Sequence, residues 1–149
     1  MRRFTTTVSA VALSLVLGGG AALAADYGTA EEAKKMLDET VEAMKSDKKG
    51  TIEKINAGEM KDRDLYPYCG GPDGKMVAHP SEKVRAMNLK ELKDKSGKAF
   101  GQDLYDEAEQ GEVNEVSYMW PRPDEQEPVQ KVAYVTKVDD MVCAVGYYK

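Results

Sequence analysis

The first third of the chain carries apolar residues at steps of three and four, which is the spacing of one helix face. These residues are Ala33, Met36, Leu37, Val41 and Met44. Thr29 is followed three residues later by Glu32, a capping-box pattern that satisfies backbone N–H groups at a helix start. The pattern predicts a helix that begins after Thr29 and ends near Gly50. A shorter helix is expected between Thr51 and Gly58.

The middle of the chain changes to a strand pattern. Residues 65–69 and 75–79 read as two strands, and the Gly-Gly-Pro-Asp-Gly run at 70–74 reads as the turn between them. Pro67 lacks the N–H group that a central strand uses, so an irregularity is expected there. The segment therefore predicts a β-hairpin.

The remaining residues predict a helical insert and then three strands. Residues 88–92 fit a single helical turn and residues 99–109 a short helix. Three strands follow at 113–120, 129–138 and 141–148, the first of them with alternating apolar positions. The order of helix, two strands, helical insert and three strands predicts an α+β fold.

The N-terminal residues change the picture of where the protein resides. Arg2 and Arg3 precede an apolar run from Val8 to Leu17, and the run ends in an Ala-Leu-Ala-Ala cleavage pattern at 22–25. This order of basic, apolar and small residues is typical of a secretory signal peptide. We expect residues 1–25 to be removed, leaving residues 26–149 as one periplasmic domain without stable membrane insertion.

The charge balance narrows the class of partner. The whole chain has 21 basic and 26 acidic residues, and residues 1–25 contain two of the arginines and no acid. The mature chain therefore has a net charge of −7. Such a protein is not drawn to nucleic acid or to an anionic membrane by bulk charge.

Candidate reactive residues are few. Cys69 and Cys143 are too far apart for a C-x-x-C motif, and an even count in an oxidising compartment favours a disulfide over two buried free thiols. His79 is the only histidine, so no metal site is indicated. The sequence contains no G-x-S-x-G, H-E-x-x-H or phosphate-binding glycine loop. Neither an enzyme nor a cofactor is expected.

Four segments together resemble the single-Cache type 2 family of PAS-like extracellular sensor domains. They are Asp-Gly-Lys-Met-Val-Ala-His-Pro at 73–80, Leu-Lys-Asp-Lys-Ser-Gly-Lys at 92–98, Val-Ser-Tyr-Met-Trp-Pro at 116–121 and Gly-Tyr-Tyr at 146–148. The resemblance implies a long N-terminal helix packed on a five-stranded antiparallel sheet, with the helical insert between strands 2 and 3. It also implies that the first and last strands are neighbours, which makes a Cys69–Cys143 bridge geometrically reasonable.

The resemblance further implies the binding of a small organic molecule, such as a short carboxylate or an amino acid. Most Cache domains belong to membrane receptors, whereas this sequence shows no later membrane helix and no output module. We therefore expect a free-standing secreted form that presents its ligand to a membrane sensor or transporter. The alternative is an interaction scaffold that docks on such a partner without a ligand of its own.

The resemblance places the pocket between the sheet and the helical insert. Tyr118 and Trp120 share one strand face and are expected to supply aromatic walls, with core packing as the alternative. Lys131 is the expected cation for a carboxylate, although a solvated strand lysine is equally compatible. Tyr134 lies three residues from Lys131, so a regular strand points the two side chains to opposite faces unless a bulge intervenes. His79 either contacts the ligand or fixes its loop by a hydrogen bond.

Overall fold

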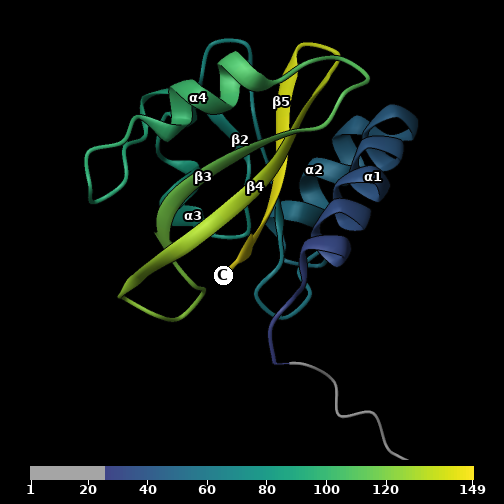
Figure 1. The fold of residues 1–149 in the computed structure, drawn as a ribbon. Coiled ribbons are helices and arrows are strands. Elements are labelled where there is room, and N and C mark those ends of the chain that lie inside the picture. Colours follow the sequence, from purple (N-terminus) through teal and green to yellow (C-terminus); the bar gives the residue numbers. More distant parts are fainter. Residues whose placement is uncertain (1–25) are drawn as a thin grey trace, which may run out of the picture.

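The computed structural model describes residues 26–149, so the expected signal peptide at residues 1–25 lies outside the described residues. The chain folds into a five-stranded antiparallel sheet with helices on both faces (Figure 1). The helical elements are α1 (Ala30–Ser46), α2 (Lys48–Asn56), α3 (Glu82–Arg85), the 3₁₀ turn η1 (Leu89–Glu91) and α4 (Phe100–Glu107). The strands are β1 (Pro67–Gly70), β2 (Met76–Ala78), β3 (Asn114–Pro121), β4 (Pro128–Val138) and β5 (Met141–Tyr148).

The start of α1 is as predicted, but its end is not. The Thr29 side chain accepts a hydrogen bond from the Glu32 N–H group and the Glu32 side chain accepts one from Thr29, which completes the capping box. The helix ends at Ser46 rather than near Gly50, because the carboxylate of the next residue, Asp47, accepts a hydrogen bond from the Gly50 N–H group and starts α2. Gly50 therefore lies in the first turn of the second helix.

The strand order is β2-β1-β5-β4-β3, which confirms the expected α+β fold and sheet. Pro67 is the first residue of β1, a position that tolerates proline. The irregularity expected at Pro67 occurs instead between Cys69 and Gly70, where the pairing of β1 with β2 shifts register. Helix α3 was not expected, because its four residues are too short to show a period.

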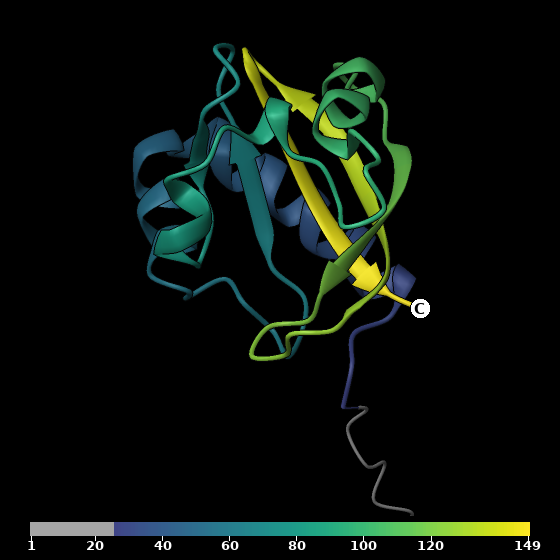
Figure 2. The same cartoon turned by 90° about the vertical axis from the view of Figure 1, so that its left-hand side faces the viewer.

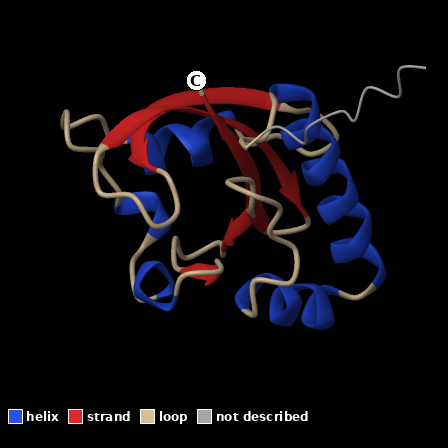
Figure 3. Cartoon of the chain, turned by 90° about the horizontal axis from the view of Figure 1, so that it is seen from below, coloured by secondary structure: helices blue, strands red, loops and turns tan. Residues whose placement is uncertain are grey.

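Helices lie on both faces of the sheet, as the turned views show (Figures 2 and 3), and each face carries its own apolar cluster. Helices α1 and α2 pack on one face around Leu37, Met44 and Val145. Helix α4 and the turn η1 pack on the other face around Phe100 and Leu104. Among the described residues, no helix has both the length and the apolar character needed to cross a bilayer.

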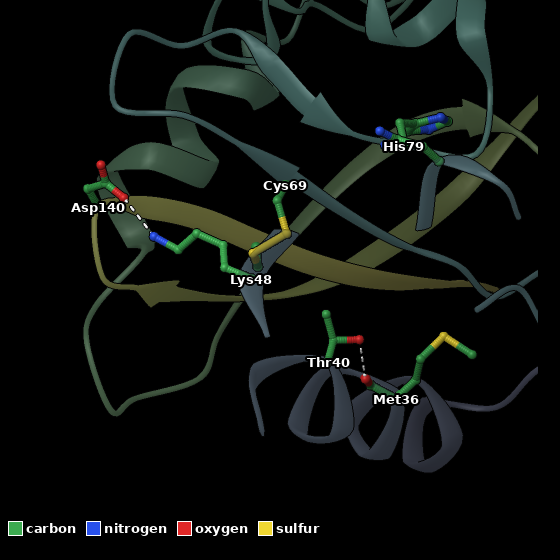
Figure 4. The surroundings of a disulfide bond; sticks show 8 residues. Met36, Thr40, Lys48, Cys69, His79 and Asp140 are labelled. Carbon is green, nitrogen blue, oxygen red and sulfur yellow. Dashed lines mark hydrogen bonds and ion pairs between the residues drawn. A yellow bond between two sulfur atoms is a disulfide. The ribbon is translucent and has the colours of Figure 1, made fainter. Parts of the chain in front are cut away.

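A disulfide joins the first strand to the last and confirms the expected pairing. Cys69 of β1 and Cys143 of β5 are directly opposed in the sheet, with their Cα atoms 4.2 Å apart. Both residues are fully buried in the layer that α1 covers. In Figure 4, the helix turn of Met36 and Thr40 and the ring of His79 lie on opposite sides of this bridge.

The exposed edge of β3 is closed by the loop at 94–98. The Asp94 carboxylate accepts hydrogen bonds from the Met119 N–H group at 3.0 Å and from the Ser96 and Lys98 N–H groups. The Lys98 ammonium donates to the carbonyl oxygen of Ser117 at 2.6 Å. Because these bonds occupy edge groups that another chain would use, the loop protects the sheet against edge-to-edge pairing.

Candidate functional site

Three polar side chains form a row across the sheet on the face opposite α1. Tyr118 of β3 is paired with Lys131 of β4, and Lys131 is paired with Tyr148 of β5. Directly opposed residues point to the same face, so the pairing itself brings the three side chains together. Tyr118 and Tyr148 are each 5% exposed, and Lys131 is 1% exposed. The centre of the row is therefore a buried amine.

Tyrosines surround this amine. Lys131 Nζ donates a hydrogen bond to the Tyr66 hydroxyl at 2.8 Å and a longer one to the Tyr148 hydroxyl at 3.4 Å. It also lies 4.1 Å from the ring centroid of Tyr66 and 4.8 Å from that of Tyr148. These cation–π contacts stabilise a desolvated ammonium group.

No carboxylate neutralises Lys131 within the part of the chain that the structure describes, where every ion pair involves other residues. A buried cation without an anionic partner is unfavourable, because neither water nor a counter-charge replaces its hydration. A negatively charged group beside Lys131 would supply the counter-charge that the described residues do not.

The tyrosine hydroxyls near Lys131 are neutral hydrogen-bonding groups. Tyr148 donates to the carbonyl oxygen of Pro121 at 2.9 Å, and Tyr68 and Tyr118 share a hydrogen bond of 2.8 Å. Burial raises the pKa of Tyr68, Tyr118 and Tyr148 above the usual tyrosine range. Tyr66 accepts from Lys131, so its own proton is available to Tyr148, 3.4 Å away, or to a bound molecule.

A glycine makes room for the lysine stem. Gly146 lies on β5, on the strand next to Lys131. A Cβ atom at this position would lie 2.4 Å from Lys131 Cε and 3.0 Å from Lys131 Cγ. The buried path of the lysine side chain therefore depends on a residue without a side chain at position 146.

His79 adds a further polar group beside the lysine. Its Nδ1 atom accepts a hydrogen bond from the Ser81 N–H group at 2.9 Å, so in the neutral ring the proton lies on Nε2. Burial, followed by the positive charges of Lys131 and Arg85, lowers the pKa of His79 to about 3. The loop-fixing hydrogen bond and a position in the cavity wall are both present. His79 thus offers a neutral N–H donor.

Two adjoining cavities lie at this group of residues. The inner cavity has a volume of about 20 Å³ and is lined by Lys131, by Tyr66, Tyr68 and Tyr118, by His79 and by apolar residues that include Phe100. The outer cleft has a volume of about 600 Å³ and reaches the loop at 121–125. The first is the size of about one water molecule, whereas the second is in the range of small-molecule pockets.

The rim of the outer cleft is tied to the start of the described chain by Arg122. Its guanidinium lies over the rings of Tyr27 and Tyr148, at 4.3 and 5.2 Å from their centroids. Arg122 Nε lies 3.5 Å from the carboxylate of Asp64, which also accepts a hydrogen bond from the Gly28 N–H group at 2.7 Å. These contacts fix the ring of Tyr148 that borders Lys131.

Four of the ligand-site residues expected from the sequence come together: Tyr118, Trp120, Lys131 and His79 all line the inner cavity. Tyr134 does not join them. The strand β4 is regular between the two residues, so Tyr134 points to the α1 face, where its ring stacks on that of Tyr147.

Sequence reasoning missed Tyr66, Tyr68 and Tyr148 as members of the site. Tyr66 and Tyr68 flank Pro67 at the start of β1, so their alternation was visible, but nothing in the sequence joins this strand to β4. Tyr148 was visible only as part of the Gly-Tyr-Tyr segment. Within residues 26–149, no cluster of histidine, cysteine and acidic side chains could hold a metal ion.

Chemotaxis receptors are among the proteins that this chain resembles. It is 32% identical over 75 residues to the methyl-accepting chemotaxis protein McpP of Pseudomonas putida. The match covers 50% of this chain and 14% of McpP, so it spans about a seventh of that receptor.

Solved sensor domains share the fold. A methyl-accepting chemotaxis protein from Vibrio parahaemolyticus superposes with a TM-score of 0.66 at 24% identity, over 79% of this chain and 86% of that one. A Cache chemosensory domain whose structure was described for carboxylic acid recognition superposes with a TM-score of 0.55 at 20% identity, over 79% of this chain and 86% of that one.

The family relationship rests on a match that covers most of the described chain. The model of the Cache domain matches residues 32–149, from the first turn of α1 to the residue after β5. The sheet order and the helices agree with the architecture that this family implies. The chain therefore belongs to the Cache domain family.

Proposed function

We propose that this protein is a periplasmic sensing module that binds a small organic carboxylate at Lys131. The observation that carries the proposal is the buried lysine amine, which lies beside a cavity and has no carboxylate partner among the described residues. A carboxylate ligand would supply the missing negative charge. The carboxylate would therefore bind most strongly at the buried ammonium group that has no counter-charge in the free protein.

The surrounding groups favour a carboxylate head group over other small molecules. Lys131, the Tyr66 hydroxyl and the Nε2–H group of His79 can all donate hydrogen bonds to carboxylate oxygens. The inner cavity has no aspartate or glutamate in its lining. An α-amino acid would leave its ammonium group without a counter-charge there, so we favour a simple carboxylate over an amino acid.

The relatives support a sensing role. McpP is a methyl-accepting chemotaxis protein, and one structural neighbour was described for carboxylic acid recognition. By analogy, we propose that the ligand-bound protein acts on a membrane sensor or transporter rather than as an enzyme. The predicted signal peptide and the Cys69–Cys143 disulfide support a periplasmic location.

A second candidate is an interaction scaffold that docks on a membrane receptor without its own ligand. The small inner cavity favours it, because about 20 Å³ beside Lys131 leaves most of the space occupied by the protein's own side chains. The two candidates differ in one measurable property, which is saturable binding of a carboxylate.

Isothermal titration of the exported, disulfide-intact protein tests the proposal. Acetate, propionate and butyrate are titrated beside glycine and methylammonium, and melting temperature is followed in parallel. We expect saturable binding of the acids with a rise in melting temperature. Lys131→Met abolishes this binding, whereas Lys137→Met, at an exposed position of the same strand, leaves it unchanged. A folded protein that binds none of the acids would favour the scaffold.

A further inference from the structure

Two cavities of very different size meet at the site. Four residues line both the inner cavity and the outer cleft: Tyr66, His79, Val84 and Trp120. Residues that line two adjoining spaces border the opening between them. Tyr66 and His79 are the polar members beside Lys131, so Val84 and Trp120 are the apolar border of that opening.

Val84 is held in place although its helix is short. Helix α3 spans Glu82–Arg85, and both of its ends are tied to the loop of His79. The Ser81 N–H group donates to the His79 ring, and Arg85 donates to the His79 carbonyl oxygen at 2.6 Å. Val84 itself is half-buried against the core cluster of Phe100 and Tyr118. Its side chain is therefore a fixed part of the wall.

Trp120 is braced by other aromatic rings. Phe100 stacks on Tyr118 with centroids 3.9 Å apart, and Trp120 meets Phe100 edge-on at 5.4 Å. Such offset and edge-on pairs hold aromatic rings in defined positions. Widening the opening at Trp120 would require several rings to move, whereas at Val84 only two methyl groups border it.

We infer that Val84, which borders the opening together with Trp120, sets the maximum chain length of the acid that the site accepts. The inference rests on the proposed function, in which the carboxylate binds at Lys131. From there the acyl chain extends toward the outer cleft. An inner cavity of about 20 Å³ has room for no more than part of the carboxylate head group, so the acyl chain must lie in the opening that Val84 narrows. Val84 is thus the residue that determines ligand length.

The test compares acids of increasing length on matched variants. Acetate, propionate, butyrate and hexanoate are titrated into wild type, Val84→Ala, Val84→Ile and Val77→Ala. Val77 is the matched control, because it is also half-buried but packs on the opposite, α1-covered layer. We expect Val84→Ala to raise the affinity for hexanoate relative to acetate about tenfold, the scale of a methylene fitted or refused by a pocket. Val84→Ile shifts the ratio the other way, and Val77→Ala leaves it unchanged.

The outcomes separate this inference from the proposed function. If wild type binds acids and Lys131→Met does not, but both Val84 variants keep the wild-type length profile, the inference is overturned and the proposed function stands. If wild type binds none of the acids, both are overturned. Circular dichroism verifies that each variant is folded, and Val84→Ile keeps the test decisive should the alanine variant unfold.

Discussion

Lys131 Nζ lies 2.8 Å from the hydroxyl oxygen of Tyr66 and 4.1 Å from the centroid of the same ring, although 65 positions separate the two residues in sequence. The tyrosine therefore contacts the ammonium group both through its oxygen and through its π face. Neither contact carries a full negative charge. The arrangement holds the lysine in place, and no carboxylate among residues 26–149 forms an ion pair with it.

Replacing Lys131 with methionine should therefore separate stability from binding. Met keeps most of the apolar stem and removes the uncompensated charge, so we expect the free energy of unfolding to rise by about 1 kcal/mol. Urea unfolding at neutral pH measures it. Lys137→Met, on the exposed part of β4, should change it by less than about 0.5 kcal/mol. A large loss of stability in Lys131→Met would show that the lysine is a structural group.

His79 predicts a specific acid sensitivity. Its pKa of about 3 in the folded protein lies below the ordinary value near 6.5. Between these two pH values the unfolded chain therefore binds a proton at His79 that the folded protein does not bind. The stability that His79 contributes is complete above about pH 6.5 and is lost as the pH falls toward 3. Well below 6.5 the loss approaches about 1.4 kcal/mol per pH unit.

The pH dependence of unfolding in His79→Gln isolates this contribution. We expect the free energy of unfolding of wild type to fall more steeply than that of the variant between pH 6.5 and pH 4, as measured by urea titration at each pH. Equal slopes in the two proteins would mean that His79 takes up its proton in the folded state as readily as in the unfolded chain.

Asp94 predicts a second pH range, below that of His79, in which the protein loses stability. Hydrogen bonds from the Ser96 side chain, the Met119 N–H group and the loop backbone lower its pKa to about 2. The stabilisation from the ionised carboxylate is complete above about pH 4 and is lost as the pH falls through 2. Asp94→Asn should reduce the free energy of unfolding at pH 7 by about 2 kcal/mol, the scale of a hydrogen bond to a charged group. The difference from wild type should shrink between pH 4 and pH 2, and a constant difference would contradict the assignment.

The disulfide predicts a redox-dependent stability. Cys69 and Cys143 are 74 positions apart, and closing a loop of that length restricts the unfolded chain by about 4 kcal/mol in the chain-entropy model. Cys143→Ser should lower the melting temperature of the oxidised protein. In reducing buffer the wild type should melt close to the variant. Equal melting temperatures under oxidising conditions would show that the bridge does not restrict the unfolded state.

The periodicity of apolar residues predicted the long helices and strands. It missed the helix boundary that a single capping side chain determines, and it missed the shortest helix. The strand at 141–148 was predicted with the bounds that β5 has. The end of α1 was wrong because the carboxylate of Asp47 caps a new helix, and a helix pattern continues across such a break. Helix α3, with four residues, has no measurable period.

The site was predictable only where one strand supplied it. Tyr118 and Trp120 share a face by alternation, and Lys131 lies in the next strand along the chain as the cation expected for a carboxylate. Tyr66 and Tyr148 reach the amine because β5 lies between β1 and β4, which is a property of the strand order and not of local sequence. Tyr134 was placed beside Lys131 only on condition of a bulge, and the regular β4 does not contain one.

Gly146 has a consequence for how sequences of this family are compared. Lys131 follows its buried path only because position 146 carries no side chain, since a Cβ atom would meet the lysine stem at 2.4 Å. The residues at positions 131 and 146 should therefore be compared as a pair. A homologue with a lysine at the first position and a larger residue at the second must direct its amine elsewhere. An alignment that scores the lysine alone would then group proteins whose lysine side chains lie in different places.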